Sequence, residues 1–159
     1  MKVKSTAKAF SLVELLIVIA IISIIGTIAV SSFAKYRGNS CLREAAREIT
    51  GDIQLCKQKA VAENVRYRIL LFTSCNNYTI QKETFHDNWV NVSSIKNIGE
   101  DDNAIKIIGD PTYPADKIIF QPRGTTNAGT LVLQHKENYS TASIVTSLMG
   151  RVRIKYDFK

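Results

Sequence analysis

The sequence predicts an α+β fold, in which one long amino-terminal helix precedes a small antiparallel β-domain. Two observations predict it. An apolar run over residues 10–33 continues into an amphipathic segment over residues 34–63. From residue 64 to 159 the periodicity changes to short alternating stretches separated by turn residues, which is typical of β-strands. The 159 residues have room for one domain of ordinary size.

The apolar run is long enough to cross a membrane. A helix over residues 10–33 would measure about 36 Å, against a hydrocarbon core of about 30 Å. Three lysines among the first eight residues favour an amino terminus on the cytoplasmic side. A cleaved signal peptide, with a small-residue site at Ala29 to Ser31, is the alternative. The apolar run exceeds the usual ~7–15 residues of a signal peptide, and Glu14 interrupts its start.

Glu14 is the one charge inside the apolar run. A carboxylate in hydrocarbon costs about 2.5–3.5 kcal/mol, so it needs a partner or a position near the interface. If the chain is cut immediately before Phe10, Glu14 lies four residues from a new terminal ammonium. The two charges could then pair within or between subunits.

The second half of the helix is predicted from the spacing of its apolar side chains. They recur at intervals of three and four, which defines one face of a helix. The members of this face are Leu42, Ala45, Ala46, Ile49, Ile53, Cys56 and Ala60. The arginines and glutamates between them are expected to form a solvated face.

Alternation and turn residues predict the strands of the β-domain. In "VRYRILLF", Val65, Tyr67 and Ile69 share one face while Arg66 and Arg68 share the other. A turn leads from there into "YTIQKE". Further strands are expected at Ala104–Ile108, Lys117–Phe120, Thr130–Gln134, Ser143–Ser147 and Arg151–Tyr156. The polar region from about Thr84 to Asp102 carries no clear pattern around Trp89.

The chain lacks the residue patterns of catalytic and metal sites. His86 and His135 are far apart in the sequence and are expected at the surface rather than as ligands or bases. Asp101 and Asp102 are better explained by a solvated loop than by a cation site. We therefore expect no enzyme, no metal and no cofactor.

The cysteines do not indicate a zinc site. The three cysteines form no Cys-x-x-Cys pair. If residues 39–62 are helical, Cys41 and Cys56 lie about 22 Å apart, too far for a disulfide. A bond from Cys75 to either of them stays open.

The carboxyl-terminal stretch "GRVRIKYDFK" alternates cations with apolar residues. A strand would place Arg151, Arg153 and Lys155 on one side, and Lys159 adds a fourth positive charge. Cations about 6.6 Å apart come close to the roughly 7 Å phosphate spacing of an extended nucleic acid strand. Tyr156 and Phe158 could stack on bases if exposed. The simpler alternative is an edge strand whose charges deter aggregation.

The amino-terminal stretch "AFSLVELLIVIAIISIIGTIAV" resembles the class III signal of type IV pilins and type II secretion pseudopilins. The resemblance implies that residues 1–9 are a leader, cut by a prepilin peptidase between Ala9 and Phe10. It further implies that Phe10 becomes N-methylated, and that Glu14 neutralises the terminal amine of a neighbouring pilin during assembly. The family usually has Gly before the cut, where this chain has Ala9.

Three further stretches, "AAREITGDIQLCKQKAVAENVRYRI", "IIFQPRGTTNAGTLVL" and "IVTSLMGRVRI", are similar to the GspH/FimT group of minor pilins and pseudopilins. This similarity implies a β-sandwich packed on the carboxyl half of the long helix. It also implies a single-pass inner-membrane protein, with its carboxyl-terminal domain in the periplasm, that enters a pilus or pseudopilus in low copy near the tip.

Within that group, Gly150, Arg151 and Arg153 resemble the Gly-Arg-x-Arg motif that the FimT branch uses to bind DNA in natural transformation. The resemblance implies a FimT-like minor pilin that binds DNA through Arg151 and Arg153, and the alternating pattern adds Lys155 and Lys159 to the expected site. Two alternatives stay open: a GspH-like minor pseudopilin of a type II secretion system, and a structural minor pilin that primes pilus assembly without binding DNA.

Overall fold

The computed structural model describes residues 11–85, 87–99 and 104–159, with the side chains at 28–32 and 34 outside this set. The chain divides into two units, Met1–Tyr36 and Arg37–Lys159. One helix, α1, runs from Leu12 to Glu63 and belongs to both units. The predicted helix is therefore confirmed, whereas the predicted leader over residues 1–9 lies outside the described residues.

In the first unit, the apolar side chains in the described part of α1 are exposed to solvent. This holds for the aliphatic residues between Leu12 and Ile25, and Glu14 stands in the first turn of the helix. Within the described residues, no helix contains a stretch long and apolar enough to span a membrane. Phe10 and the five side chains at 28–32 within the predicted span lie outside the described set, so the span over residues 10–33 stays a prediction.

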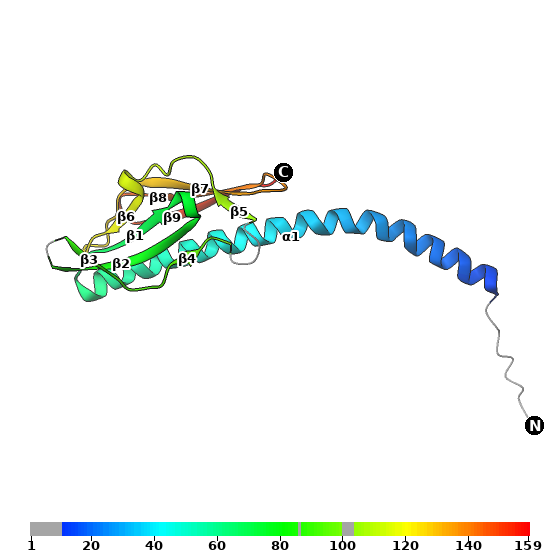
Figure 1. Cartoon of the computed structure of the whole chain (residues 1–159), viewed down its shortest axis with the longest axis horizontal. Helices are drawn as coiled ribbons and strands as arrows, with labels where there is room; N and C mark the ends of the chain where they lie inside the picture. The colour runs from blue at the N-terminus through cyan, green and yellow to red at the C-terminus, as the bar shows by residue number, and fades with distance from the viewer. Residues whose placement is uncertain (1–10, 86, 100–103) are drawn as a thin grey trace, which may run out of the picture. The chain divides into compact units, whose positions relative to one another are not determined.

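The second unit contains two antiparallel sheets (Figure 1). The first, five-stranded among the described residues, has the order β3-β2-β1-β6, and β4 also pairs with β2. Its strands are β1 (Tyr67–Phe72), β2 (Asn77–Phe85), β3 (Asn88–Asn91), β4 (Lys96–Asn97) and β6 (Lys117–Phe120). Short 3-10 turns at Thr73–Cys75 and Pro114–Asp116 precede β2 and β6.

The second sheet, four-stranded in the described part of the chain, has the order β5-β7-β8-β9. Its strands are β5 (Ile105–Ile107), β7 (Gly129–His135), β8 (Thr141–Thr146) and β9 (Val152–Asp157). Among the strands that the structure describes, β9 pairs only with β8 and thus forms one edge of this sheet. The α+β pilin-like fold predicted from the sequence is confirmed: a long helix packs on two antiparallel sheets.

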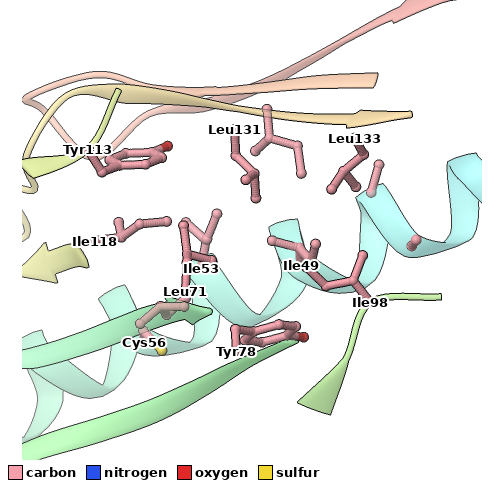
Figure 2. Packing of buried hydrophobic residues seen from close by; sticks show 14 of the residues in the cluster. Ile49, Ile53, Cys56, Leu71, Tyr78, Ile98, Tyr113, Ile118, Leu131 and Leu133 are labelled. Carbon is pink, nitrogen blue, oxygen red and sulfur yellow. The ribbon is translucent and has the colours of Figure 1, made fainter. Parts of the chain in front are cut away.

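The core lies where the helix meets the inner faces of the two sheets (Figure 2). All seven residues of the predicted helical face, from Leu42 to Ala60, are buried. They pack with Leu71 and Tyr78 from the first sheet and with Leu131 and Leu133 from the second. Burial of each large side chain contributes about 1.5–3 kcal/mol, so this face holds the helix to both sheets.

One expected surface residue is buried. His135 ends β7 with an exposed fraction of 5%, so its predicted surface position is wrong. Alternation along β7 places it on the same inward side as Leu131 and Leu133. Its Nδ1 accepts the backbone N–H groups of Glu137 and Asn138 at 3.3 and 3.5 Å. His86 lies outside the described residues.

Close packing against α1 explains why a glycine precedes the amphipathic half of the helix. A Cβ on Gly38 would lie 3.1 Å from Cε1 of His135 and 3.0 Å from Nδ2 of Asn138. The same Asn138 Nδ2 donates to Oδ1 of Asn39 at 2.8 Å. The β7–β8 turn therefore packs closely on α1 at position 38, where a side chain would press on His135 and Asn138.

The polar region without a clear pattern contains two of the strands. β3 and β4 both pair with β2, and β4 is only two residues long. Such short strands offer too few positions for alternation to be recognised.

All three cysteines are unpaired, and Cys75 is exposed. Asp101 and Asp102 lie outside the described residues.

Candidate nucleic-acid interface

The β8–β9 turn begins the candidate interface. It is closed by hydrogen bonds from Ser147 N to Arg151 O at 2.9 Å and from Gly150 N to Ser147 O at 2.8 Å. Gly150 has a φ of +67°, in the left-handed region that favours glycine. A Cβ there would also lie 2.5 Å from the carbonyl oxygen of Gly124. This turn thus depends on glycine for two independent reasons.

The cations that follow the turn point to one side, as predicted. Arg153 and Lys155 on β9 are exposed, as is Arg151 just before the strand. Val152, Ile154 and Tyr156 face the other side and pack against the core. Alternate residues of a strand lie about 6.6 Å apart, so the three charges form a row along a sheet edge.

These three cations are available to a ligand. Among the described residues, none of Arg151, Arg153 and Lys155 forms an ion pair with a carboxylate. Their neighbours on β8 are uncharged, since Arg153 pairs with Val145 and Lys155 with Ser143. Arginine forks bind phosphate in a bidentate manner, so the row suits a polyanion. We call Arg151, Arg153 and Lys155 the β9 cation row.

Lys159 is separated from the β9 cation row by an acid. Asp157 is exposed on the same side of the strand as Arg153 and Lys155. Lys159 lies beyond the end of β9, where its backbone N–H donates to Ser140 Oγ at 3.1 Å. Lys159, expected as a fourth cation of the site, is therefore separated from Lys155 by the carboxylate of Asp157.

The two aromatic side chains near the carboxyl terminus do not join the cations. Tyr156 and Phe158 stack on each other, with ring centroids 5.4 Å apart. The guanidinium of Arg43 lies 4.6 Å from the centroid of the Phe158 ring. Tyr156 is half-buried and packs against the core, whereas Phe158, just beyond the end of β9, is 37% exposed, so base stacking by Phe158 stays a prediction.

Two further cations, which the sequence analysis missed, lie at the β8–β9 turn. Lys57 of α1 donates from Nζ to the carbonyl oxygens of Gly150 and Met149, at 3.1 and 3.4 Å. Arg123 is exposed in the turn after β6, whose Thr126 N–H donates to Leu148 O at 3.1 Å. No spacing rule joins positions 57, 123 and 151, because only the tertiary fold brings them together.

The two turns and the β9 cation row form one cationic end of the second unit. Neither turn, over residues 121–126 and 147–151, contains an acidic residue. On the same outer side, β7 and β8 present only uncharged side chains: Thr130, Val132, Gln134, Thr141, Ser143 and Val145. In the part of the chain that the structure describes, no group of three or more His, Cys, Asp or Glu could hold a metal ion.

The fold and the amino-terminal motif together define a pilin-like subunit. Residues 45–150 match the family described as type II transport protein GspH, and residues 4–30 match the prokaryotic N-terminal methylation motif. Because the first match covers well over half of the chain, the protein belongs to the GspH family. These matches imply a membrane-anchored component of a pilus or pseudopilus that associates with other pilins. The family is structural and non-enzymatic, as the sequence predicted.

Solved structures support the same fold. The minor pseudopilin EpsH from the type II secretion system of Vibrio cholerae is 12% identical, with a TM-score of 0.62 over 72% of this chain and 96% of that one. The type IV minor pilin FimU from Pseudomonas aeruginosa is 14% identical, with a TM-score of 0.57 over 72% of this chain and 87% of that one. No curated protein matches the chain at a significant level.

Proposed function

We propose that the protein is a FimT-like minor pilin whose β9 cation row binds DNA without sequence preference, for uptake in natural transformation. One observation carries the proposal: Arg153 and Lys155 on the edge strand β9, and Arg151 immediately before it, are exposed and have no carboxylate partner among the described residues. A row that neutralises phosphates gains affinity from counterion release and does not depend on the bases. Lys159 would add to this contact beyond Asp157.

The amino-terminal segment would supply the anchor and the assembly contact. We infer that a prepilin peptidase cuts between Ala9 and Phe10 and that Phe10 is then N-methylated. The span over residues 10–33 would hold the subunit in the inner membrane, with the second unit in the periplasm. Glu14 would pair with the terminal amine of a neighbour and bring the subunit into the filament, near its tip.

A salt titration tests the DNA contact. The full-length protein in neutral phosphatidylcholine nanodiscs is titrated with labelled duplex DNA at several salt concentrations. We expect the logarithm of the affinity to fall linearly with the logarithm of the salt concentration. In Arg151→Gln/Arg153→Gln the slope should be smaller by about 2, since each phosphate contact contributes about 0.9. Absence of binding by the parent protein at low salt would refute the proposal.

The matched control removes a charge elsewhere on the same sheet. Lys106 is exposed on β5, at the opposite edge from β9. Lys106→Gln lowers the net charge by one, as each arginine substitution does. If the β9 cation row is the site, this variant should keep the parent slope. An equal loss from Lys106→Gln would mean that net charge alone attracts the DNA.

A second candidate function is a purely structural one. A GspH-like minor pseudopilin, or a minor pilin that primes assembly, would bind only protein partners. The description of the matching family favours it. This candidate predicts no DNA binding at any salt concentration, together with loss of filament assembly when the protein is deleted.

The processing proposal has its own measurement. Mass spectrometry of the mature protein should find Phe10 at the amino terminus with one added methyl group. Glu14→Gln should still be processed but should enter filaments poorly, because the neutral amide cannot pair with an ammonium. A mature terminus near Ser32 would instead indicate signal-peptide cleavage.

A further inference from the structure

The tip of the β8–β9 turn carries two exposed apolar side chains. Leu148 is 66% and Met149 is 78% exposed, although both belong to a hydrogen-bonded hairpin. The turn is the direct continuation of the β9 cation row, since Gly150 and Arg151 follow Met149 in the chain. An apolar tip thus stands beside the first cation of a proposed DNA site.

The backbone of this tip is held from several sides. Leu148 O accepts the N–H of Thr126, while Lys57 Nζ donates to Met149 O and Gly150 O. The two side chains therefore project from a fixed backbone, so their placement against a ligand costs little conformational entropy. A rigid apolar projection can act as a wedge.

The surroundings of the tip point to a polyanionic partner. Arg123 is exposed on the neighbouring turn and Arg151 follows the tip, and residues 121–126 and 147–151 contain no acid. Lys57 also lies at the tip, and beyond Arg151 the positive charges continue along β9 at Arg153 and Lys155. A row spaced by about 6.6 Å matches successive phosphates of one strand better than the headgroups of a membrane surface.

We propose that Leu148 and Met149 insert against DNA bases while Arg151 and the rest of the β9 cation row hold the adjacent phosphates, so that the protein prefers DNA with unstacked bases. The inference rests on the proposed DNA-binding function and adds the class of DNA. Apolar wedges of this kind part base steps in other DNA-binding proteins. The cost of unstacking is smallest in a single strand, which makes single-stranded DNA the preferred ligand.

The test compares a single-stranded oligonucleotide of about 16 nucleotides with the duplex of the same sequence. The protein is full length, in neutral phosphatidylcholine nanodiscs. Leu148→Ser/Met149→Ser should weaken binding to the single strand about tenfold, because the apolar contact with the bases is lost. The salt slope should stay unchanged, because no charge is removed. A 2-aminopurine base in the strand should brighten with the parent protein and not with the variant.

Ile95→Ser is the matched control. Ile95 is 60% exposed between β3 and β4, so its substitution removes one exposed apolar side chain outside the β8–β9 turn. It should leave both the affinity for the single strand and the 2-aminopurine signal at parent values. A similar loss in this control would mean that the effect of the Leu148 and Met149 substitutions is unspecific, and would overturn the inference.

The remaining outcomes separate this inference from the function on which it rests. If the parent binds both DNAs with a salt-dependent affinity and the double variant matches it, the wedge is wrong while DNA binding stands. If the parent binds neither DNA, both fail. If the variant loses only its binding to vesicles of phosphatidylcholine with phosphatidylglycerol, the tip contacts lipid, which overturns the inference.

Discussion

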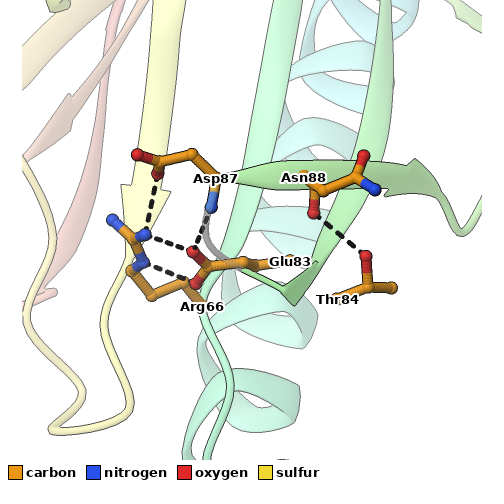
Figure 3. Close-up of polar contacts among 5 residues, drawn as sticks. All are labelled: Arg66, Glu83, Thr84, Asp87 and Asn88. Atoms are coloured by element: carbon orange, nitrogen blue, oxygen red, sulfur yellow. Dashed lines mark hydrogen bonds and ion pairs between the residues drawn. The ribbon is translucent and has the colours of Figure 1, made fainter.

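The two sheets of the second unit use positive charges in opposite ways. In the five-stranded sheet, Arg66 donates from Nε to Glu83 at 2.6 Å, contacts Glu83 again through Nη2, and reaches Asp87 at 2.8 Å (Figure 3). The hydrogen bond to Glu83 raises the pKa of Arg66 above its usual range. Lys82 pairs with Glu63 at 2.5 Å in the same sheet. Here cations hold strands and helix in place.

In the four-stranded sheet, the β9 cation row has no such partners among the described residues. The same residue types therefore serve two purposes, and the presence of a carboxylate distinguishes them. A cation engaged in a pair contributes to folding, while an unpaired row on an edge strand contributes charge to the surface. Stability and DNA binding should thus respond to different substitutions.

The largest loss of stability should follow from breaking the buried polar cluster of the first sheet. Asp52, with an exposed fraction of 8%, accepts the hydroxyl of Tyr78 and the ammonium of Lys96, each at 2.7 Å. Asp52→Ala leaves both groups without this acceptor and should cost about 2–4 kcal/mol in urea unfolding. The control Asp157→Ala removes an exposed carboxylate and should change stability by less than about 0.5 kcal/mol. Equal effects would contradict the comparison.

The next largest effect concerns the turn before the β9 cation row. Gly150→Ala places a Cβ against the Gly124 carbonyl and also strains a φ of +67°. Gly109 has the same φ of +67°, but a Cβ there would meet no heavy atom within 4 Å, so Gly109→Ala carries only the backbone strain. We expect Gly109→Ala to cost about 1 kcal/mol and Gly150→Ala about 1–2 kcal/mol more. If both variants lose the same stability in thermal unfolding, the added Cβ at position 150 does not clash with the carbonyl oxygen of Gly124.

A smaller difference should separate two arginines. Arg66→Gln breaks the pairs with Glu83 and Asp87 and should lower the free energy of unfolding by about 1–2 kcal/mol. Arg153→Gln removes a charge without a partner among the described residues and should change it by less than about 0.5 kcal/mol. Urea unfolding of both variants, side by side, checks this order. If Arg153→Gln lowers the free energy of unfolding more than Arg66→Gln does, the charge of Arg153 stabilises the fold and the comparison is wrong.

A further effect should appear only at alkaline pH. Burial, followed by the hydrogen bond to Glu63, raises the pKa of Tyr67 to about 12. Because the folded protein holds this proton more tightly than the unfolded chain, the stabilisation is complete below pH of about 10 and is lost above it. Unfolding midpoints of the parent should fall above that pH, and Tyr67→Phe should flatten the fall. If the unfolding midpoint of Tyr67→Phe falls with pH as that of the parent does, other titrating groups cause the loss of stability.

The sequence predicted the parts that depend on periodicity. Intervals of three and four from Leu42 to Ala60 identified the buried face of α1, because a helix in contact with a core must repeat in that way. Alternation in "GRVRIKYDFK" placed Arg153 and Lys155 opposite Val152 and Ile154. Both patterns were confirmed, since each element buries one side and exposes the other.

The parts that depend on tertiary contact could not be predicted. Lys57 and Arg123 reach the β8–β9 turn from distant positions, and nothing in their local sequence points to Gly150. His135 was expected at the surface from its type, but its register on β7 buries it. Asp157 was visible in the sequence, at the same alternation as Arg153, and could have been found by following the pattern two residues further.

One measurement tests the central claim that the β9 cation row serves DNA binding and not folding. The variant Arg151→Gln/Arg153→Gln is measured both by urea unfolding and by DNA titration across salt concentrations. We expect an unfolding free energy within about 0.5 kcal/mol of the parent value, together with a salt slope smaller by about 2. A destabilised variant with an unchanged salt slope would contradict the account.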